Sequence, residues 1–243
     1  HRNPRKGTLD APEKILEGLE FDRSVMIDEV FLDEFDLEET HRRIHENTSE
    51  LLEYDKPMIS VGGDHSVSYP VIKALKQEHP KLKMVWLDAH LDLKEKVDDH
   101  ISHDVVVRQL VEEGLFEPEE IYFVGITEID HDEEEFLKEN NFNFYRPDEL
   151  DGFLKEFEGR AYVSIDIDVL RAEVAPGTGY PDGDLVLEEV LEVIEAVDHV
   201  HADIVEGAPS LDKGKTVKTS RKIPTSLVSR GFLLNIGGKG IFM

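Results

Sequence analysis

The chain has 243 residues, of which 54 are acidic and 27 basic, giving a formal net charge of −27. It contains no cysteine, so disulfide bonds and thiolate metal ligands are excluded. An acidic surface repels nucleic acid, whose binding needs clustered lysine and arginine, and attracts cations. We expect most of this charge to form a solvated coat.

Short apolar runs alternate with amphipathic stretches along the chain. Buried parallel strands are predicted at 57–61, 84–87, 121–125, 142–145, 162–167 and 202–205. Helical spacing predicts helices at 37–54, 67–77, 105–113, 133–139 and 185–197, and a last helix at 216–232 that Pro224 should bend or break. This alternation predicts an α/β fold, with a parallel sheet covered by helices on both faces.

No repeat, low-complexity tract or long linker divides the sequence, so residues 1–243 are expected to form a single domain. No apolar run approaches the roughly 20 residues of a membrane span, and the first residues lack the apolar segment of a signal peptide. We therefore expect a cytoplasmic protein that binds neither membranes nor nucleic acid.

Polar side chains directly follow apolar strands in four segments, and open α/β sheets bind their ligands at such strand ends. The segment 59–66 ends a strand in two glycines, which allow a sharp turn, and continues to His65. In the second segment, Asp88, His90 and Asp92 alternate, so an extended backbone would turn all three to the same side.

The other two segments place carboxylates at strand ends. Asp166 and Asp168 are expected to share one face of a strand, where two close like charges are costly unless a cation neutralises them. The fourth strand ends in Glu206. Other histidines are interpreted as structural or surface groups: His41, His45, His79, His100, His131, His199 and His201.

Each segment alone has a plain structural interpretation, because an acid after a strand often lies in a solvated turn, and Asp64 or Ser66 would cap a helix well. Together, four independent strand ends carry only oxygen and imidazole donors. The predicted ligands, too many for one ion, are His65, Asp88, His90, Asp92, Asp166 and Asp168. They predict two ions that share bridging carboxylates, with Mn²⁺ preferred and other divalent metals as alternatives.

These motifs resemble those of the ureohydrolase family, which contains arginases, agmatinases and related guanidino hydrolases, and they are closest to agmatinases. Gly-Gly-Asp-His-Ser stands at 62–66, Asp-Ala-His-x-Asp at 88–92, Ser-x-Asp-x-Asp at 164–168 and Ala-Pro-Gly-Thr-Gly at 175–179. The similarity runs in order through most of the chain, and the combination is highly specific. It implies an arginase-like three-layer sandwich and a homo-oligomer, either a trimer or a hexamer.

The resemblance also implies roles for individual residues. One ion would be held by His65, Asp88, Asp92 and Asp166, and the other by His90, Asp88, Asp166 and Asp168. His103 matches a loop histidine that shuttles protons, and Glu206 matches the acid that holds the substrate's guanidinium. These roles agree with general chemistry, because paired cations lower the pKa of water, a carboxylate pairs with a planar guanidinium and histidine transfers protons near neutral pH.

The sequence departs from the family pattern in three places. Arg171 and Ala172 stand where the family usually has Asp-Pro, which puts the shape of that loop in doubt. Asp104 follows the loop histidine where a small residue is usual, and adds charge beside it. Residues 3–7 resemble the loop after the family's first strand, so that strand is expected to be absent.

The leading hypothesis is an enzyme that hydrolyses agmatine to putrescine and urea, a step of polyamine biosynthesis. Arginase, guanidinobutyrase and formimidoylglutamase are the alternatives within the family. A non-catalytic metal-binding homologue is the alternative from another class; Arg171 and Asp104 favour it, whereas His103 and Glu206 argue for an enzyme.

The segment 93–100 bears on the choice of substrate. Its acids, Glu95, Asp98 and Asp99, would repel the carboxylate of arginine and suit the amine of agmatine. Its lysines, Lys94 and Lys96, would instead attract the carboxylate of arginine. A solvated loop that makes no substrate contact is an equally good interpretation.

Overall fold

The computed structural model describes residues 7–17, 19, 27–33, 35–98, 100–229 and 233–238. The strands within them are β1 Ile27–Phe31, β2 Met58–Val61, β3 Lys83–Leu87, β4 Ile121–Val124, β5 Asn143–Tyr145, β6 Arg160–Asp166, β7 Asp198–Val205 and β8 Leu233–Gly238. The helices are α1 Ala11–Leu16, α2 Leu37–Leu52, α3 Ser68–Glu78, α4 Val106–Glu112, α5 Glu134–Glu139, α6 Leu150–Glu156, α7 Leu187–Ala196, α8 Lys215–Ser220 and α9 Lys222–Ser229. None of these described helices is both long and apolar enough to cross a membrane.

The described strands form one sheet in the order β1-β8-β2-β7-β6-β3-β4-β5, and every pair is parallel. The six predicted strands are confirmed as β2 to β7, and β7 begins four residues earlier than expected. β1 and β8 were not predicted from the sequence. In β1, acids interrupt the apolar residues, and both Ile27 and Phe31 are 53% exposed.

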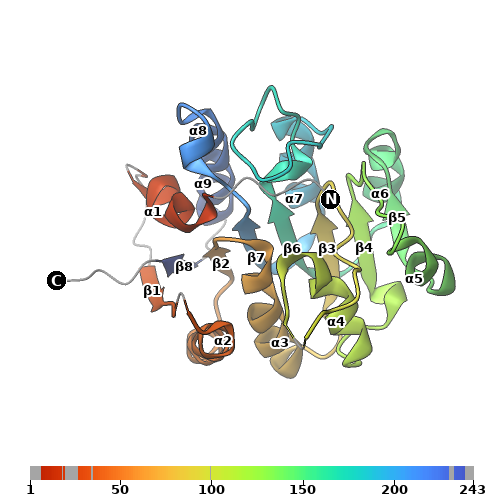
Figure 1. Ribbon diagram of the computed structural model, residues 1–243, viewed down its shortest axis with the longest axis horizontal. Helices are drawn as coiled ribbons and strands as arrows, with labels where there is room; N and C mark the ends of the chain where they lie inside the picture. The colour runs from red at the N-terminus through yellow and green to blue at the C-terminus, as the bar shows by residue number, and fades with distance from the viewer. Residues whose placement is uncertain are drawn as a thin grey trace.

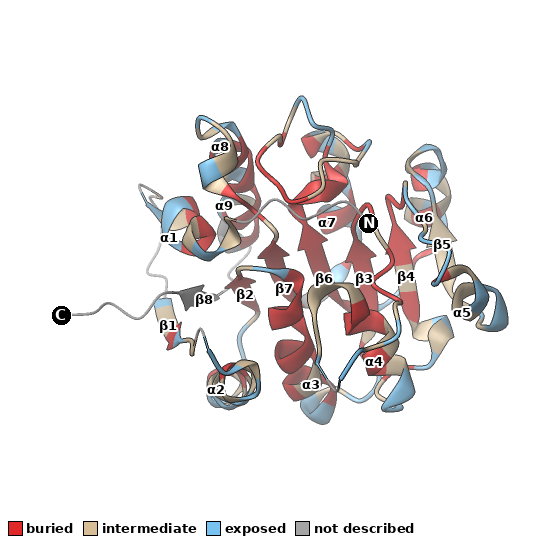
Figure 2. Ribbon diagram, viewed as in Figure 1, coloured by how far each residue is buried: buried red, intermediate tan, exposed pale blue. Residues whose placement is uncertain are grey.

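Side chains of the central strands alternate between two hydrophobic cores, one on each face of the sheet. On β3, Val85 and Leu87 point into one core, whereas Met84 and Trp86 point into the other, and all four are fully buried. Helices α1, α6, α7 and α9 contribute to the first core, and α2, α3 and α4 to the second (Figure 1). Figure 2 shows the buried strands between these two helical layers. The predicted three-layer sandwich is thus confirmed.

The predicted last helix is wrong in one respect. The helix breaks at Arg221, between α8 and α9, and not at Pro224. Pro224 is the third residue of α9, where the missing N–H group needs no partner within the helix. Residues 230–232 of the prediction lie outside the described part. That residues 1–243 form a single domain lacking a first strand stays a prediction.

Candidate functional site

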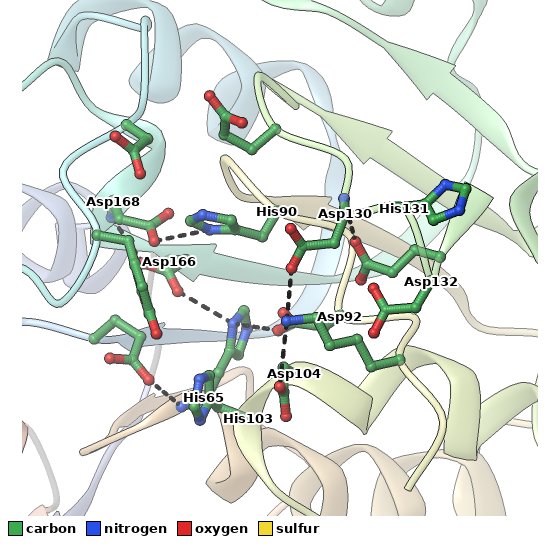
Figure 3. A pocket seen from close by; sticks show the side chains of 16 residues that line it. His65, His90, Asp92, His103, Asp104, Asp130, His131, Asp132, Asp166 and Asp168 are labelled. Atoms are coloured by element: carbon green, nitrogen blue, oxygen red, sulfur yellow. Dashed lines mark hydrogen bonds and ion pairs between the residues drawn. The ribbon is translucent and has the colours of Figure 1, made fainter. Parts of the chain in front are cut away.

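Four adjacent central strands, β2, β7, β6 and β3, end at the same edge of the sheet, because they run parallel. A cavity of about 640 Å³ lies at this edge, lined by residues that follow these strands (Figure 3). Of the six predicted metal ligands, only Asp88 is not in the lining, and it is 1% exposed. His103 and Glu206 line the same cavity.

The turn after β2 places His65 beneath the cavity. A Cβ atom on Gly62 would lie 2.5 Å from Val67 Cγ2, so the chain passes where only glycine fits. Asp64 caps the following 3-10 turn, because its Oδ1 accepts a hydrogen bond from the Ser66 amide at 3.0 Å. The His65 ring stacks on Trp86, with 4.0 Å between ring centroids, and is 1% exposed.

The expectation of an extended backbone after β3 is wrong, although the three side chains converge as predicted. The chain bends at once, and the His90 amide donates to Asp88 Oδ1 at 2.7 Å. Asp92 has a φ of 52°, a left-handed conformation that is costly for a residue other than glycine. Its carbonyl accepts hydrogen bonds from the amides of Val107 and Arg108 at the start of α4, which hold this conformation.

Asp166 and Asp168 also converge through a turn and do not share a strand face. Asp166 is the last residue of β6, and a 3-10 turn of Ile167–Val169 follows it. The Asp168 amide donates to Asp166 Oδ1 at 2.7 Å, which brings both carboxylates to the same edge. Tertiary packing therefore aligns these acids, and strand periodicity does not.

The first cluster consists of His65, Asp88, Asp92 and Asp166. His65 Nδ1 lies 3.1 Å from Asp88 Oδ2, 3.2 Å from Asp92 Oδ2 and 3.3 Å from Asp166 Oδ2. His65 Nδ1 and Asp88 Oδ2 are buried, and neither has a partner in hydrogen-bond geometry. Three carboxylate oxygens thus surround His65 Nδ1. The donor atoms of His65, Asp88 and Asp92 lie close enough to one another to hold a divalent cation.

The second cluster consists of His90, Asp88 and Asp168. His90 Nδ1 lies 3.3 Å from Asp88 Oδ1. It also lies 3.1 Å from Asp168 Oδ2 (Figure 3). Asp88 therefore contributes one oxygen to each cluster. Two groups of donors that could each hold a cation share this carboxylate.

The electrostatics of the clusters also favour cations. Burial, with the neighbouring charges of Asp168 and Asp88, raises the pKa of Asp166 well above its usual range. Burial and Asp88 raise the pKa of Asp168 to about 6. Bound positive charge would remove the cost of ionising these acids. The residues present therefore fit the two metal ions that the motifs imply.

Glu206 reaches the cavity from the end of β7. Its φ is 60°, and its amide donates to the Gly63 carbonyl at 2.9 Å. Its Oε1 accepts a hydrogen bond from the His65 amide at 2.8 Å. Burial, with a further contribution from the nearby charge of Asp64, raises the pKa of Glu206 to about 8. A cationic ligand beside this carboxylate would stabilise its ionised form.

The two unusual residues, Asp104 and Arg171, have local partners. Asp104 accepts a hydrogen bond from Ser102 Oγ at 2.6 Å and lies 3.5 Å from Lys94 Nζ. Arg171 is exposed; its Nε donates to the carbonyl and to Oδ1 of Asp184, at 2.7 and 2.8 Å. Arg171 is not among the residues that line the cavity, and its backbone and side chain tie the loop to the segment around Asp184.

The residues that form the outer wall of the cavity were not predicted as site residues from the sequence. These residues follow β4 or precede α7: Glu128, Asp130, His131, Asp132, Glu133, Tyr180 and Asp182. The acid-rich run after β4 was the available signal, since it also follows an apolar strand.

The segment 93–100 contributes less to the cavity than expected. Lys94 lines it, and its Nζ lies 2.7 Å from Asp130 Oδ2. Glu95 and Asp98 are exposed and do not line it, and Asp99 lies outside the described residues. Several acids after β4 line the cavity, whereas Glu95 and Asp98 do not.

Comparisons with known proteins agree with this geometry. An agmatinase from Bacillus cereus is 38% identical over 180 residues, covering 70% of this chain and 61% of the relative. A guanidinobutyrase from Pseudomonas aeruginosa is 29% identical, covering 76% of this chain and 64% of the relative. The chain thus spans about three-fifths of the length of these relatives.

A solved structure and a family comparison point the same way. The structure of proclavaminate amidino hydrolase from Streptomyces clavuligerus matches with a TM-score of 0.81 and 25% identity, over 93% of this chain and 86% of that one. The family described as the Arginase family matches residues 3–229. The chain therefore belongs to the arginase family.

Proposed function

We propose that the protein is a binuclear metal hydrolase that cleaves agmatine to putrescine and urea. The observation that carries the proposal is the pair of donor clusters sharing Asp88, beside the carboxylate of Glu206 in one cavity. The agmatinase relative at 38% identity supports the choice of substrate. We propose two Mn²⁺ ions per chain, because the donors are carboxylates and imidazoles.

Each group of the site has a defined task in this proposal. The first cluster would hold one ion and the second cluster, with Asp166, the other. Two bound cations supply the Lewis acidity that lowers the pKa of water and stabilises charge at the attacked centre. Glu206 pairs with the guanidinium and orients its carbon. Water adds to that carbon and gives up a proton, the bond from carbon to the chain nitrogen breaks, and His103 relays the released proton to the leaving nitrogen.

The outer wall supports a substrate with a cationic tail. Glu128, Asp130, Asp132 and Asp182 all line the cavity. The cation of Lys94 is neutralised within the wall by Asp130 and Asp104. The carboxylate of arginine would face these acids without a free partner, whereas the terminal ammonium of agmatine would be attracted.

The test is to measure urea release from agmatine, arginine and guanidinobutyrate on one Mn²⁺-loaded preparation, and formamide release from formiminoglutamate. We expect kcat/KM for agmatine to exceed that for arginine by roughly tenfold or more, because only arginine would bury an unpaired charge. A preference for arginine, or equal values, would overturn the substrate assignment alone. No urea and no formamide from these substrates, with two ions bound, would favour the non-catalytic homologue.

Two further properties belong to the proposal. We propose a cytoplasmic enzyme and a homo-oligomer, a trimer or a hexamer, as the family resemblance implies. Sedimentation velocity of the metal-loaded protein would test the subunit count.

A further inference from the structure

A buried hydrogen-bond network lies behind the first cluster, centred on Asp203 of β7. Asp203 is fully buried and pairs in register with Ser164 on β6. Its Oδ1 accepts hydrogen bonds from Ser164 Oγ at 2.8 Å and from the Ile165 amide at 3.2 Å. Its Oδ2 accepts from the hydroxyl groups of Ser68 and Tyr162. Four donors therefore occupy the four acceptor positions of this carboxylate.

Ser164 connects this network to His65. Ser164 Oγ lies 2.8 Å from His65 Nε2. A serine hydroxyl has one proton, and Ser164 gives that proton to Asp203. Its oxygen can then only accept from His65, so the ring proton must be on Nε2. The other ring nitrogen, Nδ1, is the atom that faces the three carboxylates of the first cluster.

We propose that Asp203 is a positioning residue that acts through Ser164 to keep the proton of His65 on Nε2, so that Nδ1 presents its lone pair to a metal ion. The inference rests on the proposed binuclear site. The outer partner of a ligating histidine fixes its tautomer and orientation, and losing such a partner typically weakens metal binding about 10- to 100-fold. A purely structural role, in which Asp203 joins β6 to β7 and α3, would give no such selectivity for one ion.

The two oxygens of Asp203 provide a matched control. The Oδ1 side leads through Ser164 to His65, whereas the Oδ2 side leads to Ser68 and Tyr162. Tyr162→Phe removes a buried hydrogen bond to Asp203 but leaves the connection to His65 intact. Ser164→Ala removes the connection without changing the charge of the network. If the two variants differ in metal affinity, the cause is therefore the hydrogen bond between Ser164 and His65. Neither a general loss of stability nor a change of charge would explain the difference.

The experiment is calorimetric titration of the metal-free full chain with Mn²⁺, with thermal unfolding of the metal-free variants measured in parallel. We expect Ser164→Ala and Asp203→Asn to weaken one of two sites about 10- to 100-fold and to leave the other within about threefold. His65→Ala, which removes the ligand itself, sets the largest loss of affinity expected at that site. Tyr162→Phe should keep both affinities within about threefold, and Ser164→Thr, which retains the hydroxyl, should restore most of the loss.

The outcomes separate the inference from the proposed function. Wild-type protein that never binds more than one ion would overturn the binuclear function. Wild-type protein that binds two ions, with Ser164→Ala binding both equally well, would overturn the role of Asp203 alone. Equal weakening of both sites, or the same weakening in Tyr162→Phe, would also overturn it. If Asp203→Asn does not fold, the comparison of Ser164→Ala with Ser164→Thr still decides.

Discussion

Glu206 combines a strained backbone with a carboxylate directed into the cavity. A φ of 60° is costly for glutamate, and the hydrogen bond from its amide to Gly63 helps to maintain it. The His65 amide holds one carboxylate oxygen at 2.8 Å. The side chain is thus oriented before any substrate arrives, as tight recognition of a planar cation requires.

Glu206→Gln should retain both metal ions but lose most of its turnover of agmatine. Glutamine can still accept from the His65 amide, yet it cannot form two charge-assisted hydrogen bonds with a guanidinium. Breaking such a buried pair costs about 2–5 kcal/mol, which corresponds to a loss in kcat/KM of about 30-fold to several thousand-fold. Steady-state kinetics with metal analysis provide the measurement.

Glu135→Gln is the matched control, since it makes the same substitution at an exposed glutamate that does not line the cavity. We expect its kcat/KM to change less than about fivefold, because a single exposed charge contributes little. Normal turnover by Glu206→Gln would show that Glu206 has a structural role only.

At the scale of elements, the contact between α2 and α3 contains a buried histidine. His41 of α2 packs against Tyr69 of α3, with 5.8 Å between ring centroids. Its Nε2 is buried without a hydrogen-bond partner. Burial lowers the pKa of His41 to about 4, although Asp64 opposes this change; His100 adds to the lowering. The contact between the two helices therefore favours the neutral ring.

This contact should make stability depend on pH. Between pH 6.5 and about 4 the unfolded chain binds a proton at His41 and the folded chain does not, so the free energy of unfolding falls as pH falls through that window. We expect a contribution on the order of 1–3 kcal/mol. Urea unfolding at several pH values should show that wild type loses more stability than His41→Leu as the pH falls from 7 to 4.

His41→Gln separates titration from packing, because glutamine is polar but does not titrate. Both variants should lose the same pH-dependent contribution, even if their stabilities at pH 7 differ. If the free energy of unfolding changes with pH in the same way for wild type and both variants between pH 7 and pH 4, this account is contradicted.

At the scale of the whole molecule, the formal charge of −27 opposes folding through self-repulsion. Raising NaCl from about 0.1 M to about 1 M shortens the Debye length from about 10 Å to about 3 Å. We therefore expect the Tm of the metal-free protein to rise, by about 2–4 °C for each kcal/mol gained. Differential scanning calorimetry measures the shift, and KCl should match NaCl if screening is its cause. An unchanged or lower Tm would show that the coat causes no net repulsion.

Much of the fold and the donor set could be predicted from the sequence because their signals are local. The core strands are continuous apolar runs, and β2 to β7 fall where those runs stand. The ligand candidates follow these runs within a few residues, so a parallel sheet alone was enough to bring His65, Asp88 and Asp166 to one edge.

The tertiary structure decided whatever depends on contacts between distant segments. β1 was not predicted because it lies at the sheet edge, where its first and last residues are exposed and acids stand between them, and only its pairing with β8 defines it. The left-handed Asp92 is held by hydrogen bonds from α4, and the bend after β3 by hydrogen bonds with the end of β4 and the segment that follows it; no local pattern encodes either. The bond between Ser164 and Asp203 joins positions 39 residues apart. Such contacts depend on strand order and register, and these are set by the packing of the whole sheet.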